Sequence, residues 1–294
     1  MIIHPKEIST AKLHAYMLSS IAPRPIAFAS TVDKNGNANL SPFSFFNAFG
    51  SNPATVVFSP ARRVRDNTIK HTLENVYETG EVVINTVNYN MVQQMSLSSV
   101  EFPKGVDEFV KSGFTKLPSQ IVKPFRVAES PVQMECKVVE VKEMGHEGGA
   151  ANLIICEILL MHINNDILDA DGHINQNKID LVARLGGNWY SRNSGSALFQ
   201  VPKPNLKPAI GIDQLPDAIR NSNILSGNDL GMLGNAEHIP TKEELESVNI
   251  GTELSETKQR FINDPEGFRD HKHILAKEFL SEHQTLKAWK ILLS

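Results

Sequence analysis

The stretch RPIAFASTVDKNGNANLSPFSFFN, residues 24–47, decides the fold that we expect for this chain. Arg24–Val32 is apolar and rich in residues that favour strands, and Ala38–Asn47 follows it after a short polar segment. Asn35-Gly36 in that segment is a strong hairpin signal, because Asn and Gly tolerate the positive φ that such turns require. The stretch therefore predicts two antiparallel strands joined by a tight turn.

The second of these strands has an unusual composition. Residues 41–46 contain two serines, one proline and three phenylalanines. Proline cannot donate a hydrogen bond to a neighbouring strand, so we expect this strand to lie at a sheet edge or to carry a bulge. An edge of this kind, lined with hydroxyl groups and aromatic rings, can receive a flat polar ligand. The candidate ligand residues are Ser41, Pro42, Phe43 and Ser44.

A basic segment, SPARRVRDNTIKHT at residues 59–72, follows where a strand at 54–59 passes into a helix at 68–79. A helix N-terminus offers free N–H groups and the positive end of a dipole, and added Arg, Lys and Thr side chains suit a phosphate. The alternative is a solvated basic turn whose hydroxyls merely cap the helix. Together with the hairpin, the segment favours a ligand that has a flat aromatic end and a phosphate tail, which describes a nucleotide. The candidate residues are Ser59, Arg63, Arg65, Asn67, Thr68, Lys70 and Thr72.

The expected helix leaves the register of this site open. Ile69, Leu73, Val76 and Tyr77 recur with helical spacing, Asp66 or Asn67 is a plausible N-cap, and Gly80 suits the helix end. If the helix begins near residue 67, Asn67 and Thr68 face the phosphate. If it begins later, Lys70 and Thr72 do.

The nucleotide is not expected to bind in a Rossmann or P-loop mode. The chain has no GxGxxG after a strand and no GK[ST] motif, and Gly148-Gly149 and Gly186-Gly187 are too short and wrongly placed for either. Flavin mononucleotide (FMN) held at the rim of a β-barrel needs neither motif.

The rest of the pattern predicts about six or seven strands and two or three short helices before residue 200. Strands separated mostly by turns favour a small antiparallel barrel over a doubly wound sheet. After the linker-like Val201–Pro204 the chain becomes polar and helical, which predicts a β domain over 1–200 and an extension over 201–294. Further expected elements are helices at 7–19, 91–97, 215–220, 241–249 and 279–293, strands at 81–87, 132–143 and 152–163, and a loop-rich flap at 98–127.

Composition excludes some functional classes. The net charge of −4 disfavours a nucleic-acid binder, which usually carries a basic surplus. No run of 18 apolar residues occurs, so we expect no membrane span, and the N-terminal residues lack the pattern of a secretory signal. Cys136 and Cys156 lie in apolar runs without CxxC spacing, and we interpret them as buried reduced thiols of a cytoplasmic protein rather than as a disulfide or metal ligands.

Other motifs predict little chemistry. Trp189 and Tyr190 can flank a ligand or a partner subunit, or simply pack in the core. We expect Asp270–His273 to lie at the surface and the acidic run 166–171 to form a polar turn rather than metal sites. The segment around Ser194 lacks the GxSxG form of a hydrolase nucleophile.

Four segments of the chain resemble, in order, the flavin reductase-like family, which includes flavoredoxins: Arg24–Ala27, Asn39–Asn47, Lys70–Asn75 and Glu78–Asn85. The resemblance covers roughly residues 10–200 and implies a mainly β fold, an FMN-binding split β-barrel that is antiparallel and Greek-key-like, with short helices. It also implies a homodimer with FMN near the subunit interface, and the helical or irregular C-terminal part would be an extension packed on the barrel or the dimer.

The resemblance extends to individual residues. In such proteins the serine-rich strand lies along the isoalloxazine ring and the ribityl chain, and a Lys-Asp-Thr or similar trio binds the phosphate. Lys70 and Thr72 match this trio, whereas His71 replaces its acidic residue. Lys104, in Phe102–Gly105, is similar to a lysine that can close over the phosphate.

The function implied is that of an FMN-dependent oxidoreductase, which moves a hydride or electrons between NAD(P)H and flavin or another acceptor. We expect the acceptor to be a small molecule or a protein, and we assign no side chain as an obligatory acid or base. One alternative is a flavoredoxin-like electron carrier that does not oxidise NAD(P)H directly. Another is a non-catalytic flavin-binding module.

Overall fold

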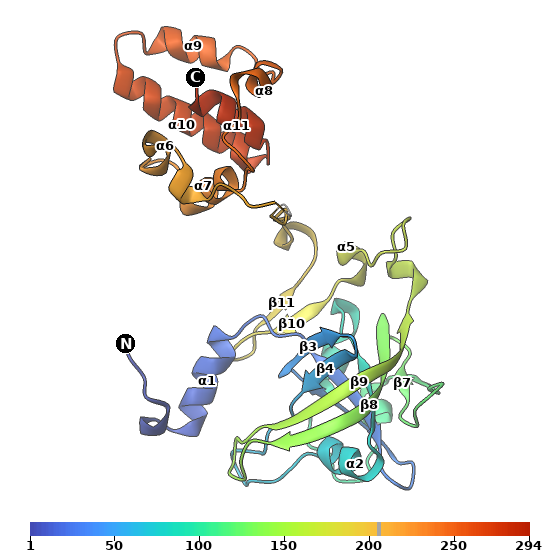
Figure 1. Cartoon of the computed structure of the whole chain (residues 1–294). Helices are drawn as coiled ribbons and strands as arrows, with labels where there is room; N and C mark the ends of the chain where they lie inside the picture. The colour runs from blue at the N-terminus through green and yellow to red at the C-terminus, as the bar shows by residue number, and fades with distance from the viewer. Residues whose placement is uncertain (205–206) are drawn as a thin grey trace. The chain divides into compact units, whose positions relative to one another are not determined.

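The computed structural model describes residues 1–204 and 207–294, which form two compact units (Figure 1). The first unit is Met1–Phe199 and the second is Gln200–Ser294. Within these described ranges, no helix combines the length and the apolar character that crossing a membrane requires.

A seven-stranded sheet, antiparallel throughout, forms the first unit. Its strand order is β2-β1-β5-β8-β9-β4-β3, which leaves β2 and β3 at the two edges. The strands at 132–143 and 152–163 have the expected bounds. The seven strands are β1 (Ala27–Val32), β2 (Ala38–Phe43), β3 (Phe46–Ser51), β4 (Ala54–Phe58), β5 (Glu81–Asn85), β8 (Val132–Glu143) and β9 (Asn152–Ile163).

The predicted hairpin is confirmed, and so is the edge position of its second strand. Strands β1 and β2 pair from Ala27↔Phe43 to Val32↔Ala38. In the turn, the Asp33 carboxylate accepts hydrogen bonds from the N–H groups of Asn35 and Asn37, both at 2.9 Å, and Gly36 takes a φ of 84°. The local sequence therefore fixes this turn.

The segment expected as one strand from 38 to 47 is in fact two strands on opposite edges of the sheet. Only Ser44 and Phe45 separate β2 from β3. Consecutive Cα atoms lie about 3.8 Å apart, so this link spans at most roughly 11 Å. The two edges of the sheet must therefore approach each other at this corner, and the sheet curls into a barrel.

Helix α2 (His71–Thr79) begins three residues later than the expected 68–79. Asp66 and Thr68 do not start the helix because they form a turn of their own, in which the Asp66 carboxylate accepts from the Thr68 hydroxyl at 2.6 Å. Lys70 takes the N-cap position without a side-chain cap, and Gly80 ends the helix with a φ of 68°, as expected. Tyr77, expected on the apolar face, is 53% exposed.

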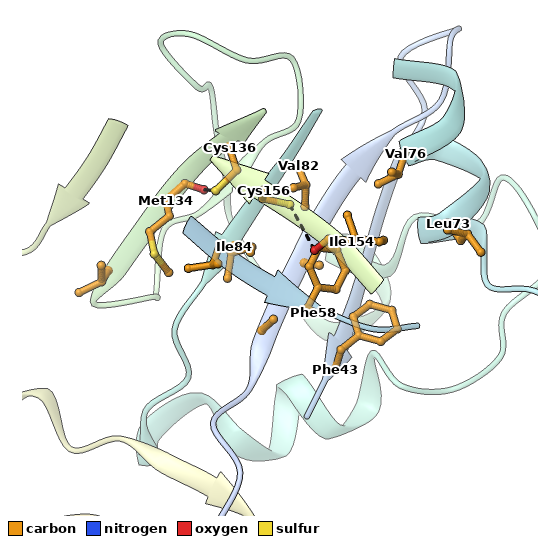
Figure 2. Close-up of a cluster of buried hydrophobic side chains, with 14 of the residues drawn as sticks. Phe43, Phe58, Leu73, Val76, Val82, Ile84, Met134, Cys136, Ile154 and Cys156 are labelled. Carbon is orange, nitrogen blue, oxygen red and sulfur yellow. Dashed lines mark hydrogen bonds between the residues drawn. The ribbon is translucent and has the colours of Figure 1, made fainter. Parts of the chain in front are cut away.

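The barrel core contains the side chains that Figure 2 shows. Leu73 and Val76 of α2 pack into the same cluster as Phe43, whose ring lies 5.6 Å from that of Phe58. Cys136 and Cys156 lie in this cluster as buried free thiols, as expected, and burial raises the pKa of the Cys156 thiol to about 12. At that pKa the thiol stays protonated and unreactive.

The expected flap at 98–127 contains short elements of regular structure that the sequence did not indicate. They are α4 (Glu108–Ser112), β6 (Lys116–Leu117) and β7 (Arg126–Val127). A pair of short strands was also missed, β10 (Val182–Arg184) and β11 (Tyr190–Arg192). The remaining helices of this unit are α1 (Thr10–Ser20), α3 (Val92–Leu97) and α5 (Gln176–Ile179), with 3-10 turns at Pro5–Glu7, Tyr89–Met91, Asn165–Ile167 and Gly195–Ala197.

The second unit is helical, with its own core. Trp289, Leu280 and Leu233 are each at most 1% exposed at its centre. The single helix expected at 279–293 is instead the end of α10 and all of α11, separated at residues 282–284. The described elements are a 3-10 turn at Ile212–Gln214, α6 (Asp217–Arg220), α7 (Gly227–Gly234), α8 (Lys242–Glu246), α9 (Glu253–Arg260), α10 (Pro265–Ser281) and α11 (Thr285–Leu292).

The barrel core predicts a clear stability effect at Ile154, whose side chain is fully buried between β4 and β8. Ile154→Ala should lower the free energy of unfolding by about 2–5 kcal/mol, because it removes buried methyl groups and leaves a cavity. The control Val139→Ala changes a strand residue that is 63% exposed, and should cost less than about 0.5 kcal/mol. Urea unfolding followed by circular dichroism measures both, and equal losses would contradict this packing.

The second unit should lose stability as the pH falls below about 6.5. The Ser222 hydroxyl oxygen accepts two backbone hydrogen bonds and so donates to His273 Nδ1 at 2.7 Å, which requires a neutral imidazole. His273, expected at the surface, is only 4% exposed because α10 turns it into the core of this unit. Burial lowers the pKa of His273, so the unfolded chain, with a histidine pKa of about 6.5, takes up the proton first. The stabilisation is therefore complete above about pH 6.5 and declines as the pH approaches the lower, folded-state pKa.

Trp289 fluorescence in a Trp189→Phe background reports unfolding of this unit, since the chain has two tryptophans and Trp289 is buried in the second unit's core. His273→Asn keeps an acceptor near the Ser222 hydroxyl but cannot titrate. It should flatten the dependence of unfolding on pH between about 5 and 7. A slope equal to that of the parent would contradict the role of His273.

Candidate functional site

A groove runs along the edge strand β2, between this strand and the segment 95–108. It consists of three hollows that share lining residues. The first, which we call the cationic hollow, is lined by Asn39, Ser41, Arg63, Lys70, His71, Thr72, residues 98–102 and Glu108. Ser99 lines both the cationic hollow and a second one, which we call the strand-end hollow. Ser96 and Tyr190 line both the strand-end hollow and a third one, which we call the tyrosine hollow.

Three cations in the cationic hollow surround one carboxylate. Glu101 accepts from Arg63 Nε at 2.8 Å and from Arg65 Nη2 at 2.5 Å, and Lys70 Nζ lies 3.7 Å away. The hydrogen bonds from Arg65 and Arg63 lower the pKa of Glu101 to about 2. Arg63 is fixed in place, because it also donates to the Thr68 hydroxyl and to the Ile69 carbonyl. The cluster therefore already holds an oxyanion.

The start of α2 adds donors to this hollow. The first bonds at this helix end run from the N–H groups of Leu73 and Glu74 to the Lys70 carbonyl. The N–H groups of His71 and Thr72 precede them and have no acceptor among the described residues. Free N–H groups at a helix N-terminus favour an anion. Burial, followed by the nearby Arg63, lowers the pKa of Lys70.

Buried polar side chains hold this helix end against β2. Asn39 donates to the Thr72 hydroxyl at 2.9 Å, and Asn75 donates to the Thr31 hydroxyl at 3.1 Å. Thr72 is fully buried. The Asn39–Thr72 bond joins the helix N-terminus to the edge strand, which are the two walls of the hollow, and the Asn75–Thr31 bond joins the helix to the neighbouring strand β1.

A buried carboxylate protects the exposed edge of β2. Glu108 accepts from the Leu40 N–H at 3.1 Å and is 5% exposed. Burial raises the pKa of Glu108, and the hydrogen bond from Leu40 partly offsets this effect. The strand edge is thereby kept from pairing with another strand while the groove beside it stays open.

The strand-end hollow has a volume of about 210 Å³. It is lined by Ile26, Pro42, Ser44, Met95, Ser96, Ser99, Arg184 and Tyr190. The Ser44 hydroxyl accepts from Arg24 Nε at 3.4 Å. The tyrosine hollow beyond it measures about 190 Å³ and is lined by Tyr89, Val92, Gln93, Ser96, Val182, Tyr190, Ser191 and Arg192.

The structure brings six of the twelve candidate residues to the groove. Ser41, Arg63, Lys70 and Thr72 line the cationic hollow, and Pro42 and Ser44 line the strand-end hollow.

Two other candidates lie beside the cationic hollow. Arg65 is 69% exposed and contributes its hydrogen bond to Glu101 from the rim. Lys104 pairs with Glu74 at 2.7 Å and lines a small hollow together with Asn39 and His71, next to the start of α2.

The remaining four candidates lie elsewhere. The Phe43 ring is in the barrel core, against Phe58. Asn67 and Thr68 belong to the turn before α2, where the Asn67 carbonyl oxygens accept from Arg62 and the Thr68 hydroxyl contacts Arg63. Ser59 is buried at the end of β4, and its hydroxyl has no partner among the described residues.

Several lining residues were not candidates from the sequence. Glu101 and Glu108 come from the flap, where no periodic sequence pattern indicated regular structure or a role in the site. Arg184 was not singled out, and Tyr190 was expected either to flank a ligand or a partner subunit or to pack in the core. The contribution of both residues to the groove depends on the missed β10–β11 pair. Trp189 does not pack in the core, because it is 76% exposed. The basic segment 59–72 holds four Arg and Lys side chains and one acid, Asp66, and this excess of positive charge is the signal that could have directed attention to Glu101.

Comparison with known proteins places this chain in a family. The family model described as "Flavin reductase like domain" matches residues 18–178, more than half of the chain. An uncharacterized protein of Aquifex aeolicus (strain VF5) is 36% identical over 199 residues, which cover 67% of this chain and 97% of that protein.

Several solved structures are similar to this chain. Nitrilotriacetate monooxygenase component B from Bacillus cereus aligns with a TM-score of 0.64 and 25% identity, over 68% of this chain and 98% of that one. Pseudomonas fluorescens 2-nitrobenzoate 2-nitroreductase NbaA aligns with a TM-score of 0.62 and 24% identity, over 72% and 100%, and supports the fold. A third structure, described as a "putative flavin reductase with split barrel domain" from Shewanella frigidimarina NCIMB 400, aligns with a TM-score of 0.57 and 26% identity, over 68% of this chain and 96% of that one. The barrel is therefore a split β-barrel. The chain belongs to the flavin reductase-like family, and this membership supports a flavin-related redox role.

Proposed function

We propose that the protein binds FMN in the β2 groove and acts as an NAD(P)H-dependent flavin oxidoreductase. The proposal rests on one observation: Arg63, Arg65 and Lys70 form ion pairs with the Glu101 carboxylate next to the N-terminus of α2. Three cations that already bind two carboxylate oxygens, together with free helix N–H groups, are the groups that bind a terminal phosphate.

The donor set fits FMN over its whole length. The phosphate would take the place of the Glu101 carboxylate, with the N–H groups of His71 and Thr72 as further donors. The ribityl chain would follow β2 past Ser41, and the ring would lie at the mouth of the strand-end hollow, beside Pro42 and Ser44, because the two hollows join at Ser99. A flavin, once bound, supplies hydride and electron transfer at its ring.

The chain's own residues would bind and orient the cofactor rather than react. Arg63 and Lys70 hold the phosphate, and Ser41 and Ser44 offer hydroxyl groups to the polar edge of the ring. Pro42 has no N–H, so it presents a flat apolar surface without an unsatisfied donor. Glu108 keeps the strand edge from pairing and so keeps the groove accessible.

Two narrower possibilities use the same groove: an electron carrier that does not oxidise NAD(P)H, and a module that only binds flavin. Stopped-flow mixing of the FMN-loaded protein with NADH and NADPH separates them. Bleaching of the flavin band near 450 nm supports the oxidoreductase, and no bleaching with either donor rejects it. We further propose that the working form is a cytoplasmic homodimer, which sedimentation equilibrium tests by the mass of the holoprotein.

Lys70→Met should weaken FMN binding by about ten- to a hundredfold and leave riboflavin binding unchanged. A charge-assisted contact is worth about 1.5–3 kcal/mol, and a tenfold change in Kd corresponds to about 1.4 kcal/mol. Riboflavin lacks the phosphate, so its Kd, measured by quenching of flavin fluorescence, serves as the internal control. Lys70 suits this test because its contact is with Glu101, and the substitution breaks no other side-chain bond among the described residues.

Lys123→Met is the matched control, since Lys123 is exposed and lies in the 118–124 segment outside the groove. It should change neither Kd. Equal losses of FMN and riboflavin affinity in Lys70→Met would contradict a phosphate contact.

Glu101→Gln should strengthen FMN binding about tenfold. The carboxylate competes with the phosphate for the same cations, and glutamine keeps the shape while removing the charge. Because the Glu101 pKa is about 2, the group is ionised throughout the range of about pH 5–8 and the gain should not vary across it. Glu140→Gln, an exposed change on β8, is the control. Isothermal titration with FMN measures the effect, and weaker binding in Glu101→Gln would show that Glu101 supports the cofactor instead.

A further inference from the structure

The arginines along the groove differ in whether a carboxylate neutralises them. At the α2 end, Arg63 and Arg65 are paired with Glu101. In the tyrosine hollow, Arg192 is paired with both oxygens of Asp180, at 2.8 and 2.7 Å. In the strand-end hollow, Arg184 has no carboxylate within 4 Å in the described part of the chain.

A second guanidinium next to Arg184 also lacks an acidic partner. Arg24 is 5% exposed, and its acceptors are all neutral: the carbonyl oxygens of Leu18, Ile21 and Leu185, and the Ser44 hydroxyl. Burial and then the charge of Arg184 lower the pKa of Arg24, as expected for two positive groups close together. Of these two guanidinium groups, that of Arg24 donates to the Ser44 hydroxyl, and that of Arg184 lines the same hollow as Ser44.

Aromatic packing holds Arg184 in position. Its guanidinium carbon lies 4.5 Å from the centre of the Tyr190 ring, and Nη1 donates to the Trp189 carbonyl at 3.2 Å. A guanidinium stacked on a ring keeps donors in its own plane for a further ligand. No aspartate or glutamate is among the described residues that line this hollow.

We propose that the strand-end hollow is a subsite for an oxyanion of the redox substrate, bound by Arg184 between Ser44 and Tyr190. This proposal rests on the proposed function, in which the flavin ring lies at the mouth of this hollow and leaves its interior free. The occupant would then lie next to the flavin ring as its redox partner. The hollow's volume of about 210 Å³ lies below the roughly 300–1,000 Å³ of drug-sized sites, so the group that enters it has the size of a single ring. The oxyanion is a carboxylate on that ring or a phosphate of a dinucleotide.

Isothermal titration with benzoate and with ADP-ribose separates these two sources, each with the protein free of flavin and saturated with FMN. Arg184-dependent binding of benzoate identifies a carboxylate ligand, and Arg184-dependent binding of ADP-ribose alone identifies a phosphate. Binding of neither probe overturns the proposal.

Arg184→Met keeps an apolar stem on Tyr190 but removes the charge, and should weaken the bound probe at least tenfold. Arg184→Lys should restore part of the affinity. The matched control is Arg192→Met, because Arg192 also stacks on a tyrosine, 4.0 Å from the Tyr89 ring centre, but is neutralised by Asp180. It should change the affinity less than twofold. Equal losses in Arg184→Met and Arg192→Met overturn the assignment to Arg184.

A comparison on the unmodified protein keeps the proposal testable if Arg184→Met does not fold. Benzamide has the shape of benzoate without the charge. If the ligand is a carboxylate, benzoate should bind at least tenfold more tightly than benzamide. If the ligand is a phosphate, ADP-ribose should bind at least tenfold more tightly than adenosine. Equal affinity within both pairs overturns the proposal. FMN itself can also fail to bind. If the flavin-free protein still binds benzoate more tightly than benzamide, or ADP-ribose more tightly than adenosine, that result rejects the proposed function but not the subsite.

Discussion

The two-residue link between β2 and β3 is the constraint on which the barrel and its groove depend. Because Ser44 and Phe45 alone connect the two edges of one sheet, the edges must meet, and β4 and β9 follow β3 around the barrel. The Ser59 N–H donates to the Phe45 carbonyl at 2.9 Å, which fastens the corner to the end of β4. The same corner places Pro42 and Ser44 at the end of an edge strand, where a ligand can approach.

The parts of the groove differ in whether a carboxylate already neutralises their positive charge. At the start of α2 the positive charge is strong but already neutralised by Glu101, so a phosphate binds there by exchange of one oxyanion for another. Glu101 reduces the repulsion among Arg63, Arg65 and Lys70 in the apoprotein, where Arg65 has Asp66 as a second partner. The exchange of Glu101 for phosphate therefore reduces the net gain in free energy on binding. At Arg184 no carboxylate is present in the described residues, and an incoming oxyanion there meets full charge.

The sequence predicted the parts of the molecule that local interactions determine. The Asn35-Gly36 hairpin, the Gly80 helix end and the long strands β8 and β9 were expected because turn chemistry and alternation specify them. The break at Ser44 and Phe45 was missed, because it results from closure of the sheet and not from a local signal. The late start of α2 was missed because Asp66 and Thr68 bond to each other instead of capping it. Glu101 and Arg184 reach the groove through tertiary contacts that no spacing shows.

A crystal structure of the protein grown with FMN tests the central claim most directly, because it locates the phosphate and the Glu101 side chain together. The account predicts the phosphate within hydrogen-bond distance of Arg63, Lys70 and the first N–H groups of α2, with the Glu101 carboxylate moved away from Arg63. It also predicts the ring beside Pro42 and Ser44. A phosphate bound elsewhere, with Glu101 still paired to Arg63 and Arg65, would contradict it.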